Sequence, residues 1–327
     1  MAKKQQDFFD RLQTMTESFL TRRRRARRIR KEKQKLKNPV RDWLEALVWA
    51  ICMVLIANQY FLQAYVIPSG SMIDTLEIGD RIFVNKLVYG PELLPGFVKL
   101  PSPFRPRRND IVIFENPSRI SRGTAFDVAQ RVIYMLTLSF VDIDRDEHGQ
   151  PRVHFLIKRT IGTGGDRIVT DRGEVRIRFP GDDRWTCERE FAAQRGWGHS
   201  TGRPMEPEQY RLLEMEGRAA AWRGLRMAVP ENLSNAPMVA IRYPDHRTFE
   251  RARLETLRSA LPHDRRYARL HALHTLGWYV PEGRIFPLGD NRGNSHDARD
   301  FGPVLVSKVL GRGAVIYWPI RRIGLLR

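Results

Sequence analysis

Cysteine is scarce in this sequence, with only Cys52 and Cys187 in a chain of 327 residues. Cys52 lies in an apolar run and Cys187 in a distant polar stretch, so an intrachain disulfide is not expected. No CxxC pair offers the spacing of a metal site. The one H-x-x-H pair, His271 and His274, stands in a polar segment and gives only a weak metal signal. We therefore predict no metal and no cofactor.

Several signatures of catalysis and nucleotide binding are also missing. The GTGGD run at 162–166 lacks the Gly-Lys-Ser/Thr ending of a phosphate-binding loop. The chain has no G-x-S-x-G nucleophile elbow, and we find no internal repeat. The sequence therefore does not indicate a P-loop nucleotidase, an α/β-hydrolase or a repeat protein.

Acidic residues are fewer than basic ones, and the formal charge is +19. Residues 22–37 carry eleven Arg or Lys and one Glu, which is about half of the excess. The rest of the chain is therefore only mildly basic. No aromatic residue interleaves this run, and an apolar segment follows it closely, so we expect it to attract anionic lipid rather than nucleic acid.

Only one apolar stretch is long, Trp43 to Leu62, and it has about the length that crosses a hydrocarbon core of ~30 Å. A buried core helix and a cleaved signal peptide are the alternatives, but the stretch starts late and runs long. We predict a retained single-pass anchor at 43–63 in the cell membrane. Because the basic run precedes it, the positive-inside rule places the tail 1–42 in the cytoplasm and the rest of the chain outside.

Beyond the anchor, short β-branched runs are separated by glycine and proline, as in RIFVNKLVY, DIVIFEN and FLIKRTIG. Strands without regular helices between them favour an antiparallel, mainly β domain. This domain is predicted to cover 64–186 and 279–327. Segment 187–278 is rich in Arg, Glu, Leu and Ala, which predicts a partly helical insertion or small second domain.

A Pro-Ser-Gly-Ser-Met turn at 68–72 follows the apolar run directly. A serine hydroxyl is a poor nucleophile until a base takes its proton. Gly70 allows a sharp bend and leaves the approach to Ser71 open. Alone, this string is more typical of a plain loop.

The candidate base is Lys158, in the strand-like run FLIKRTIG. Alternation places Lys158 on one strand face and Arg159 on the other, so one of these two basic residues should point inward. A buried lysine loses its charge easily and can then act as a base, whereas arginine cannot. We therefore favour Lys158 as the inward residue. The alternative is an ordinary strand lysine that reaches solvent.

A third polar segment, GDNRGNSHDARDFGPV at 289–304, lies between two strand-like runs. It contains Ser295, His296 and Asp297 in succession. Members of a catalytic triad meet from separate segments, and neighbours in a turn point apart, so we do not read these three as a triad. The alternative is a solvated loop.

These three segments, in this order after an anchor, resemble the bacterial type I signal peptidase family. The resemblance covers roughly residues 40–170 and 278–323. It rests on PSGSM followed by TLEIGD, on RRNDIVIF, on LIKRTIGTGGDRI and on GDNRGNSHDARDFG. Single motifs are weak, but the set is specific. The resemblance implies a Ser/Lys endopeptidase that removes signal peptides from exported preproteins after small residues of the Ala-x-Ala type.

The same resemblance implies roles for individual residues. Ser71 would be the nucleophile, Lys158 the general base, and Ser69 a hydroxyl donor to the oxyanion. Ser295 would hydrogen-bond and orient the lysine, with Asp297 and Arg299 bracing the site from behind. Shallow pockets for small substrate residues would be lined by Ile67, Met72, Leu76, Ile82 and Ile157.

Three positions depart from the family pattern: Asp74 stands where proline is frequent, Gly293 where aspartate is, and Ala298 where serine is. They bear on fine positioning, and with proline absent at 74 the turn after Ser71 is expected to be less rigid. Partners implied by the resemblance are signal peptides and membrane lipid, with no nucleic acid expected. An anchored scaffold without catalytic activity, which binds anionic lipid or nucleic acid through residues 22–37, is the alternative from another class.

Overall fold

The computed structural model describes most of the chain from Pro39 onward. The described residues are 21–22, 24–25, 39–93, 99–118, 122–137, 141–145, 149, 154–198, 205–236, 238 and 245–326. The chain divides into two compact units, 1–54 and 55–327. The expected tail 1–42, including most of the arginine-rich run, therefore lies largely outside the described residues.

Helix α2 covers Pro39–Ile56 and has no buried residue. A π-helical turn, η1 (Ala57–Phe61), follows it and leads into strand β1 (Leu62–Val66). Within the described part of the chain, no helix combines the length and apolar character needed to cross a membrane. The anchor expected at 43–63 remains a prediction.

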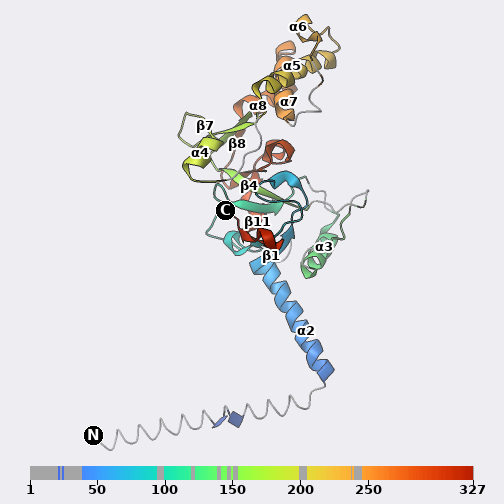
Figure 1. Ribbon diagram of the computed structural model, residues 1–327, viewed down its shortest axis with the longest axis vertical. Helices are drawn as coiled ribbons and strands as arrows, with labels where there is room; N and C mark the ends of the chain where they lie inside the picture. Colours follow the sequence, from blue (N-terminus) through green and yellow to red (C-terminus); the bar gives the residue numbers. More distant parts are fainter. Residues whose placement is uncertain are drawn as a thin grey trace, which may run out of the picture. The chain divides into compact units, whose positions relative to one another are not determined.

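One antiparallel sheet dominates the unit that begins at residue 55 (Figure 1). Its strand order is β1-β2-β11-β3-β4-β9-β10, with β12 paired to β11. The further strands are β2 (Arg81–Asn85), β3 (Ile111–Glu115), β4 (Phe155–Thr163), β9 (Arg284–Leu288), β10 (Val304–Leu305), β11 (Val309–Trp318) and β12 (Gly324–Leu325). This architecture confirms the predicted mainly β, antiparallel class.

The runs expected as strands pair as long-range neighbours in this sheet. Lys158 in β4 lies opposite Val112 in β3, and Arg159 lies opposite both Ile111 in β3 and Leu288 in β9. β4 is therefore an interior strand with neighbours on both sides. A cluster of buried apolar side chains packs on the sheet around Ile82, Val84, Ile113 and Ile316. In β2, the buried Ile82 and Val84 alternate with more exposed residues, which is the pattern of a strand that buries one face.

A second, smaller antiparallel sheet has the order β7-β6-β5-β8. It consists of β5 (Arg167–Asp171), β6 (Glu174–Arg178), β7 (Thr186–Cys187) and β8 (Trp278–Tyr279). β5 follows β4 after a turn at Gly164 and Gly165, where Gly165 has a positive φ of 90°. Strands β5 and β6 pair as an antiparallel hairpin.

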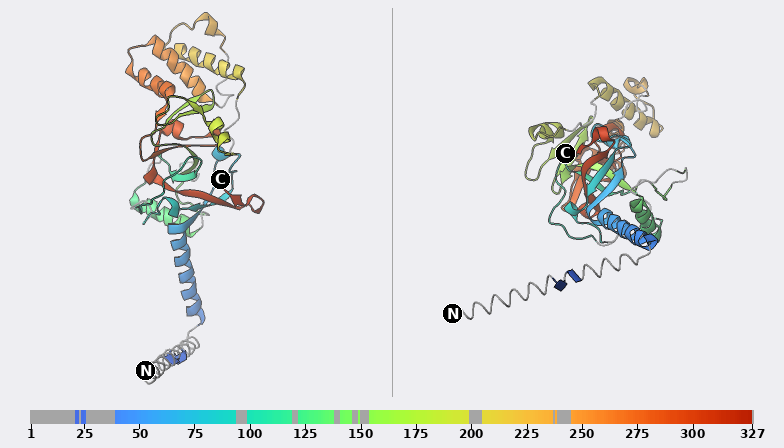
Figure 2. Two further views of the ribbon diagram at one scale, coloured as in Figure 1. Left: turned by 90° about the vertical axis from the view of Figure 1, so that its left-hand side faces the viewer. Right: turned by 60° about the horizontal axis from the view of Figure 1, so that its bottom comes forward.

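The described residues between β7 and β8 form five helices, in the segment expected to be a partly helical insertion (Figures 1 and 2). They are α4 (Glu188–Gln194), α5 (Pro207–Gly224), α6 (Glu231–Ser234), α7 (His246–Ala260) and α8 (Arg265–Leu276). α5 starts with a capping box and a proline in its first turn, which satisfies the free N–H groups there. Gly217 lets α5 approach α7 closely, because a Cβ there would lie 2.3 Å from the Phe249 carbonyl oxygen.

Short elements complete the described chain. α3 covers Thr124–Leu136 and α9 covers Ala298–Phe301. The 3-10 turns are η2 (Gly70–Met72), η3 (Leu87–Tyr89), η4 (Arg292–Asn294), η5 (Val306–Lys308) and η6 (Ile320–Arg322). Of these, η2 lies in the serine turn, and η4 and α9 lie in the polar segment 289–304, whereas Lys158 lies in β4. Both cysteines are free thiols.

Candidate active site

The side chains of Ser71 and Lys158 meet across 87 positions of the sequence. Lys158 Nζ lies 2.6 Å from Ser71 Oγ, within hydrogen-bonding distance. The same amine donates to the Ile157 carbonyl oxygen at 3.0 Å. Ser71 is 9% exposed and Lys158 is 2% exposed, so the pair is largely shielded from solvent. A base and a hydroxyl in this geometry have the arrangement that nucleophilic catalysis requires.

Burial is the main influence on the charge of Lys158. It lowers the pKa of the amine to about 8, although the carboxylates of Asp297 and Asp290 partly oppose this shift. Burial disfavours an ammonium ion that has lost its hydration. The amine is therefore neutral in a substantial fraction of molecules near pH 8 and can accept a proton from a hydroxyl.

The turn that carries Ser71 is fixed by its own hydrogen bonds and by buried neighbours. Ser69 has an extended backbone and an exposed side chain, and η2 begins after it. Leu76 N donates to Met72 O at 2.8 Å, and both of these side chains are buried. Asp74 adopts a left-handed φ of 78°, which a proline ring fixed near −65° could not reach. Proline therefore could not occupy position 74 with the backbone that this turn adopts.

The loop after β9 binds the serine turn from the other side. Asn291 N donates to Ser71 O at 3.1 Å, and its side-chain amide donates to Gly70 O at 2.9 Å. Gly289 is needed for this approach, since a Cβ there would lie 2.6 Å from Ser71 O and 2.2 Å from Ser295 Oγ. Two backbone segments are therefore held together at Ser71 by hydrogen bonds from Asn291 to main-chain carbonyl oxygens.

Ser295, expected to orient the lysine, lies in the same loop and packs against Gly289. Its Oγ is buried and has no hydrogen-bond partner among the described residues. The structure thus brings Ser295 close to the backbone of the serine turn but records no bond from it to Lys158. Its orienting role stays a prediction.

Asp297 and Arg299 form a buried ion pair behind the site, with Arg299 Nε 2.8 Å from Asp297 Oδ1. Asp297 also accepts from Gly289 N at 3.1 Å, and Arg299 donates to Arg292 O at 2.8 Å. Burial opposes ionisation of Asp297, but the Arg299 guanidinium outweighs it and lowers the pKa of Asp297 to about 2. This pair holds both ends of the loop that contacts the serine turn.

Arg159 was expected on the opposite face from Lys158, with only one of the two pointing inward. That expectation is wrong, because Arg159 is fully buried as well. It donates to Asp290 through Nε at 2.9 Å and through a terminal nitrogen at 2.8 Å. The same terminal nitrogen also donates to Thr75 Oγ1 at 3.1 Å, and the other terminal nitrogen donates to Asn109 Oδ1 at 2.9 Å. Since β4 is covered on both faces, alternation could not divide inside from outside here.

A comparison with known families gives a single clear result. The model described as "Signal peptidase, peptidase S26" matches residues 40–318, well over half of the chain. The chain belongs to this peptidase family.

Curated relatives agree with this assignment. Signal peptidase I of Haemophilus influenzae is 24% identical over 282 residues, which cover 86% of this chain and 70% of the relative. Signal peptidase I of Aquifex aeolicus is 25% identical over 286 residues, covering 85% and 84%. Probable thylakoidal processing peptidase 2 of the Arabidopsis thaliana chloroplast is 23% identical over 285 residues, covering 87% and 46%.

The insertion of this peptidase reaches the loop that contacts Ser71. Arg292 lies in η4 and forms a buried, two-point ion pair with Glu188, the first residue of α4, in which Arg292 Nη2 lies 2.7 Å from Glu188 Oε1. Arg292 Nε donates to Gly289 O at 2.8 Å. From α7, Arg247 pairs with Asp300 at 2.7 Å, and Asp300 accepts from Asp297 N at 3.1 Å. Sequence alone gave no signal for these partnerships.

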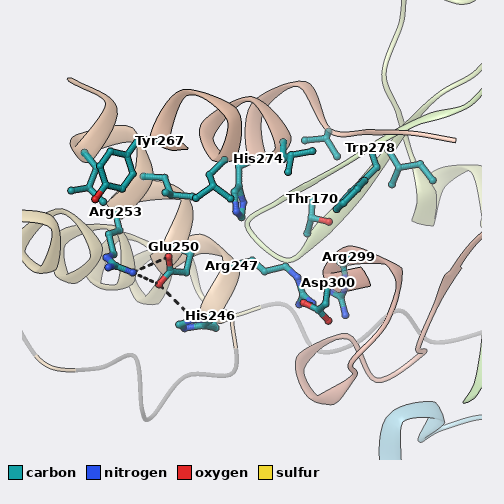
Figure 3. Close-up of a pocket in the computed structure, with 16 residues that line it drawn as sticks. Thr170, His246, Arg247, Glu250, Arg253, Tyr267, His274, Trp278, Arg299 and Asp300 are labelled. Carbon is teal, nitrogen blue, oxygen red and sulfur yellow. Dashed lines mark hydrogen bonds and ion pairs between the residues drawn. The ribbon is translucent and has the colours of Figure 1, made fainter. Parts of the chain in front are cut away.

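A pocket of about 510 Å³ lies where α7 and α8 face β5 and α9 (Figure 3). Figure 3 places Arg247, Arg299 and Asp300 together at one side of it, and Trp278 and Thr170 beside them. Its arginines are already paired, Arg247 with Asp300 and Arg299 with Asp297. The pocket therefore lies behind the loop that contacts Ser71, and neither Ser71 nor Lys158 lines it.

The residues expected to line substrate pockets all belong to one apolar cluster: Ile67, Met72, Leu76, Ile82 and Ile157. Each is at most 9% exposed. They form a close-packed layer shared by the serine turn, β2 and β4. Among the described residues, no group of three His, Cys, Asp or Glu side chains is arranged to hold a metal.

Proposed function

We propose that this chain is a serine endopeptidase that removes signal peptides from exported preproteins, with Ser71 as nucleophile and Lys158 as general base. The observation that carries the proposal is the 2.6 Å contact between Ser71 Oγ and the buried amine of Lys158. Membership in the signal peptidase family supplies the substrate class. The names of the relatives are in line with it.

The first half of the reaction is acylation. Neutral Lys158 accepts the proton of the Ser71 hydroxyl as Oγ forms a bond to the scissile carbonyl carbon. The carbonyl π electrons move to oxygen and give a tetrahedral oxyanion. When this intermediate collapses, the C–N bond breaks and protonated Lys158 returns the proton to the leaving amine. The products are the new N-terminus of the mature protein and an acyl ester on Ser71.

The second half is hydrolysis of that ester. Lys158, neutral again, takes a proton from water, and the hydroxide oxygen attacks the acyl carbon. The Ser71 oxygen leaves and recovers its proton from Lys158. The Ser71 main-chain N–H and the Ser69 hydroxyl are proposed to donate to the oxyanion in both halves. Asn291, which binds the Gly70 and Ser71 carbonyl oxygens, supports the backbone that presents them.

We propose a preference for small residues of the Ala-x-Ala type before the cut. The cluster of Ile67, Met72, Leu76, Ile82 and Ile157 is buried and close-packed beneath the serine turn. A packed apolar floor leaves shallow depressions rather than deep pockets, and a methyl group fits such a surface better than a long side chain. Ser295, Asp297 and Arg299 are proposed to position the loop around the dyad.

We further propose that residues 43–63 anchor the peptidase in the cell membrane, with the N-terminus in the cytoplasm and the catalytic unit outside. α2 exposes large apolar side chains such as Trp43, Val48, Trp49 and Met53, each more than half exposed. An apolar helix without a protein partner suits a lipid environment. The basic run before it gives the orientation.

The proposal is tested by preprotein cleavage with the full chain in detergent. Wild type should release a mature protein whose N-terminal sequencing shows one cut after a small residue. Ser71→Ala should abolish cleavage, while an exposed control, Ser118→Ala, should cleave at the wild-type rate. Persistent cleavage by Ser71→Ala would remove Ser71 from the mechanism.

A further inference from the structure

A hollow lined by arginine and aromatic side chains lies apart from Ser71 and Lys158. It has a volume of about 610 Å³ and is formed by the 103–108 loop, the end of β4 and the C-terminal part of α4 with the residues after it. We call it the arginine groove and define it by Arg105, Arg107, Arg195, Phe104 and Trp197. Neither the dyad nor the loop contacts described above use these side chains.

The charge of the arginine groove is not balanced within the described part of the chain. Arg108, deeper in the wall, is paired with Asp166. Arg105, Arg107 and Arg195 are exposed, and no acidic partner is recorded for them among the described residues. Three guanidinium groups around one hollow make a site that attracts an anion and repels a cation.

The aromatic side chains give the groove a fixed shape. The rings of Phe191 and Trp197 are 5.5 Å apart and meet edge to face. The Arg195 guanidinium lies 5.1 Å from the centre of the Phe191 ring. Pro103 and Pro106 restrict the backbone of the opposite wall. Flat aromatic ring surfaces between guanidinium donors are suited to bind an extended peptide with acidic side chains.

The groove shares one strand with Lys158. Thr163, the last residue of β4, lines the groove, and Lys158 is in the same strand. Five residues at ~3.3 Å each separate them by roughly 16 Å. An extended substrate that leaves Ser71 over the surface of the protein in the direction of β4 would therefore reach the groove with about its fifth residue from the cut.

The sheet register says which part of the substrate arrives there. β1 starts at Leu62, where the chain enters from α2, and the pairing β1–β2–β11–β3–β4 makes β4 run in the same direction as β1. Thr163 thus lies toward the end of the sheet opposite to Leu62. The apolar signal segment must remain on the membrane side, so the polypeptide that leaves toward Thr163 is the mature part.

We propose that the arginine groove binds acidic side chains in the mature segment of the preprotein, about four to seven residues after the cut. The proposal rests on the proposed function. Lysine and arginine near a membrane segment are retained on the cytoplasmic side, so the exported flank is poor in them and its charge is mainly negative. The groove would then help to align the cleavage site of the preprotein with Ser71, and it would favour preproteins with this charge pattern.

The test uses three peptides with one signal sequence and either Glu, Gln or Lys at positions 4 to 7 after the cut. At low salt, wild type should cleave the Glu peptide with the highest kcat/KM, the Gln peptide with a lower value and the Lys peptide with the lowest. One exposed ion pair contributes up to ~1 kcal/mol, about fivefold, so two arginines should separate Glu from Gln by about three- to tenfold. The difference should shrink at about 0.3 M salt because exposed charges are screened.

The double variant Arg105→Gln/Arg107→Gln should cleave the Gln peptide like wild type and lose most of the preference for Glu, since only Arg195 of the three groove arginines remains. Arg269→Gln, an exposed arginine on α8, is the control for a change of charge and should keep the preference. Wild-type kcat/KM that does not depend on peptide charge, or an undiminished preference in the double variant, would overturn the proposal. If the groove served lipid instead, the variant would alter only the response of Gln-peptide cleavage to anionic lipid in mixed micelles, which also overturns it.

Cleavage of the Gln peptide separates this proposal from the proposed function. If wild type cuts the Gln peptide and Ser71→Ala does not, the catalytic assignment holds whatever the charge preference. If neither cuts, or both cut, the catalytic assignment fails and the groove experiment gives no support to either.

Discussion

Arg159 and Asp290 form a fully buried ion pair next to Lys158 and Ser71. Arg159 follows Lys158 in β4, and Asp290 precedes Asn291 in the loop that binds Ser71 O. Asp290 also accepts a hydrogen bond from Thr75 Oγ1 at 2.6 Å, which ties in the segment after the serine turn. One pair of charges therefore joins the three segments that the site needs.

Asp290→Asn should weaken this junction. Removing one partner of a buried ion pair leaves the other charge uncompensated, which typically costs roughly 3–5 kcal/mol. A shift of the serine turn by a fraction of an ångström should lower kcat/KM by on the order of ten- to a hundredfold. Denaturant unfolding and peptide cleavage measure the two effects. Asp183→Asn, an exposed aspartate, is the control; equal behaviour of the two variants would contradict the role of Asp290.

Ser69→Ala should reduce kcat on the order of a hundredfold with little change in KM, as expected when one oxyanion donor is lost. The side chain is exposed, so the melting temperature should stay at the wild-type value. Steady-state kinetics and thermal unfolding of the same preparation check both points. A rise in KM at constant kcat would instead assign Ser69 to substrate binding.

Glu188→Gln should show that the insertion positions the catalytic loop. Arg292 would lose its buried partner and hold Gly289 O less firmly, so kcat should fall about tenfold and the melting temperature should decrease. Glu190→Gln on the exposed side of the same helix is the matched control. If Glu188→Gln lost stability but kept wild-type kcat, the ion pair would be structural only.

Parts of this architecture could be predicted from the sequence because they depend on local pattern. The β-branched runs with glycine boundaries predicted β2, β3 and β4, and the Arg, Glu, Leu and Ala pattern predicted that segment 187–278 is partly helical, as α5 and α7 are. The apolar run predicted a helix, which the structure begins earlier, at Pro39, and ends at Ile56.

Other parts depend on contacts that local pattern does not encode. Arg159 is buried because β9 covers the strand edge and Asp290, 131 residues away, supplies its charge partner. The Glu188–Arg292 pair joins residues 104 positions apart. The left-handed φ of Asp74 follows from how the serine turn closes and not from the preference of aspartate alone.

The central claim is that Lys158 acts as a neutral base, and the pH dependence of kcat/KM tests it most directly. Because activity needs the deprotonated amine, kcat/KM should rise with pH and level off above about 8, the pKa to which burial lowers Lys158. Burial lowers the pKa of Lys99 to about 8 as well, so Lys99→Arg is the control and should keep the profile. Lys158→Arg should be inactive at every pH. A wild-type profile that is flat from pH 6 to about 10, or measurable cleavage by Lys158→Arg, would contradict the account.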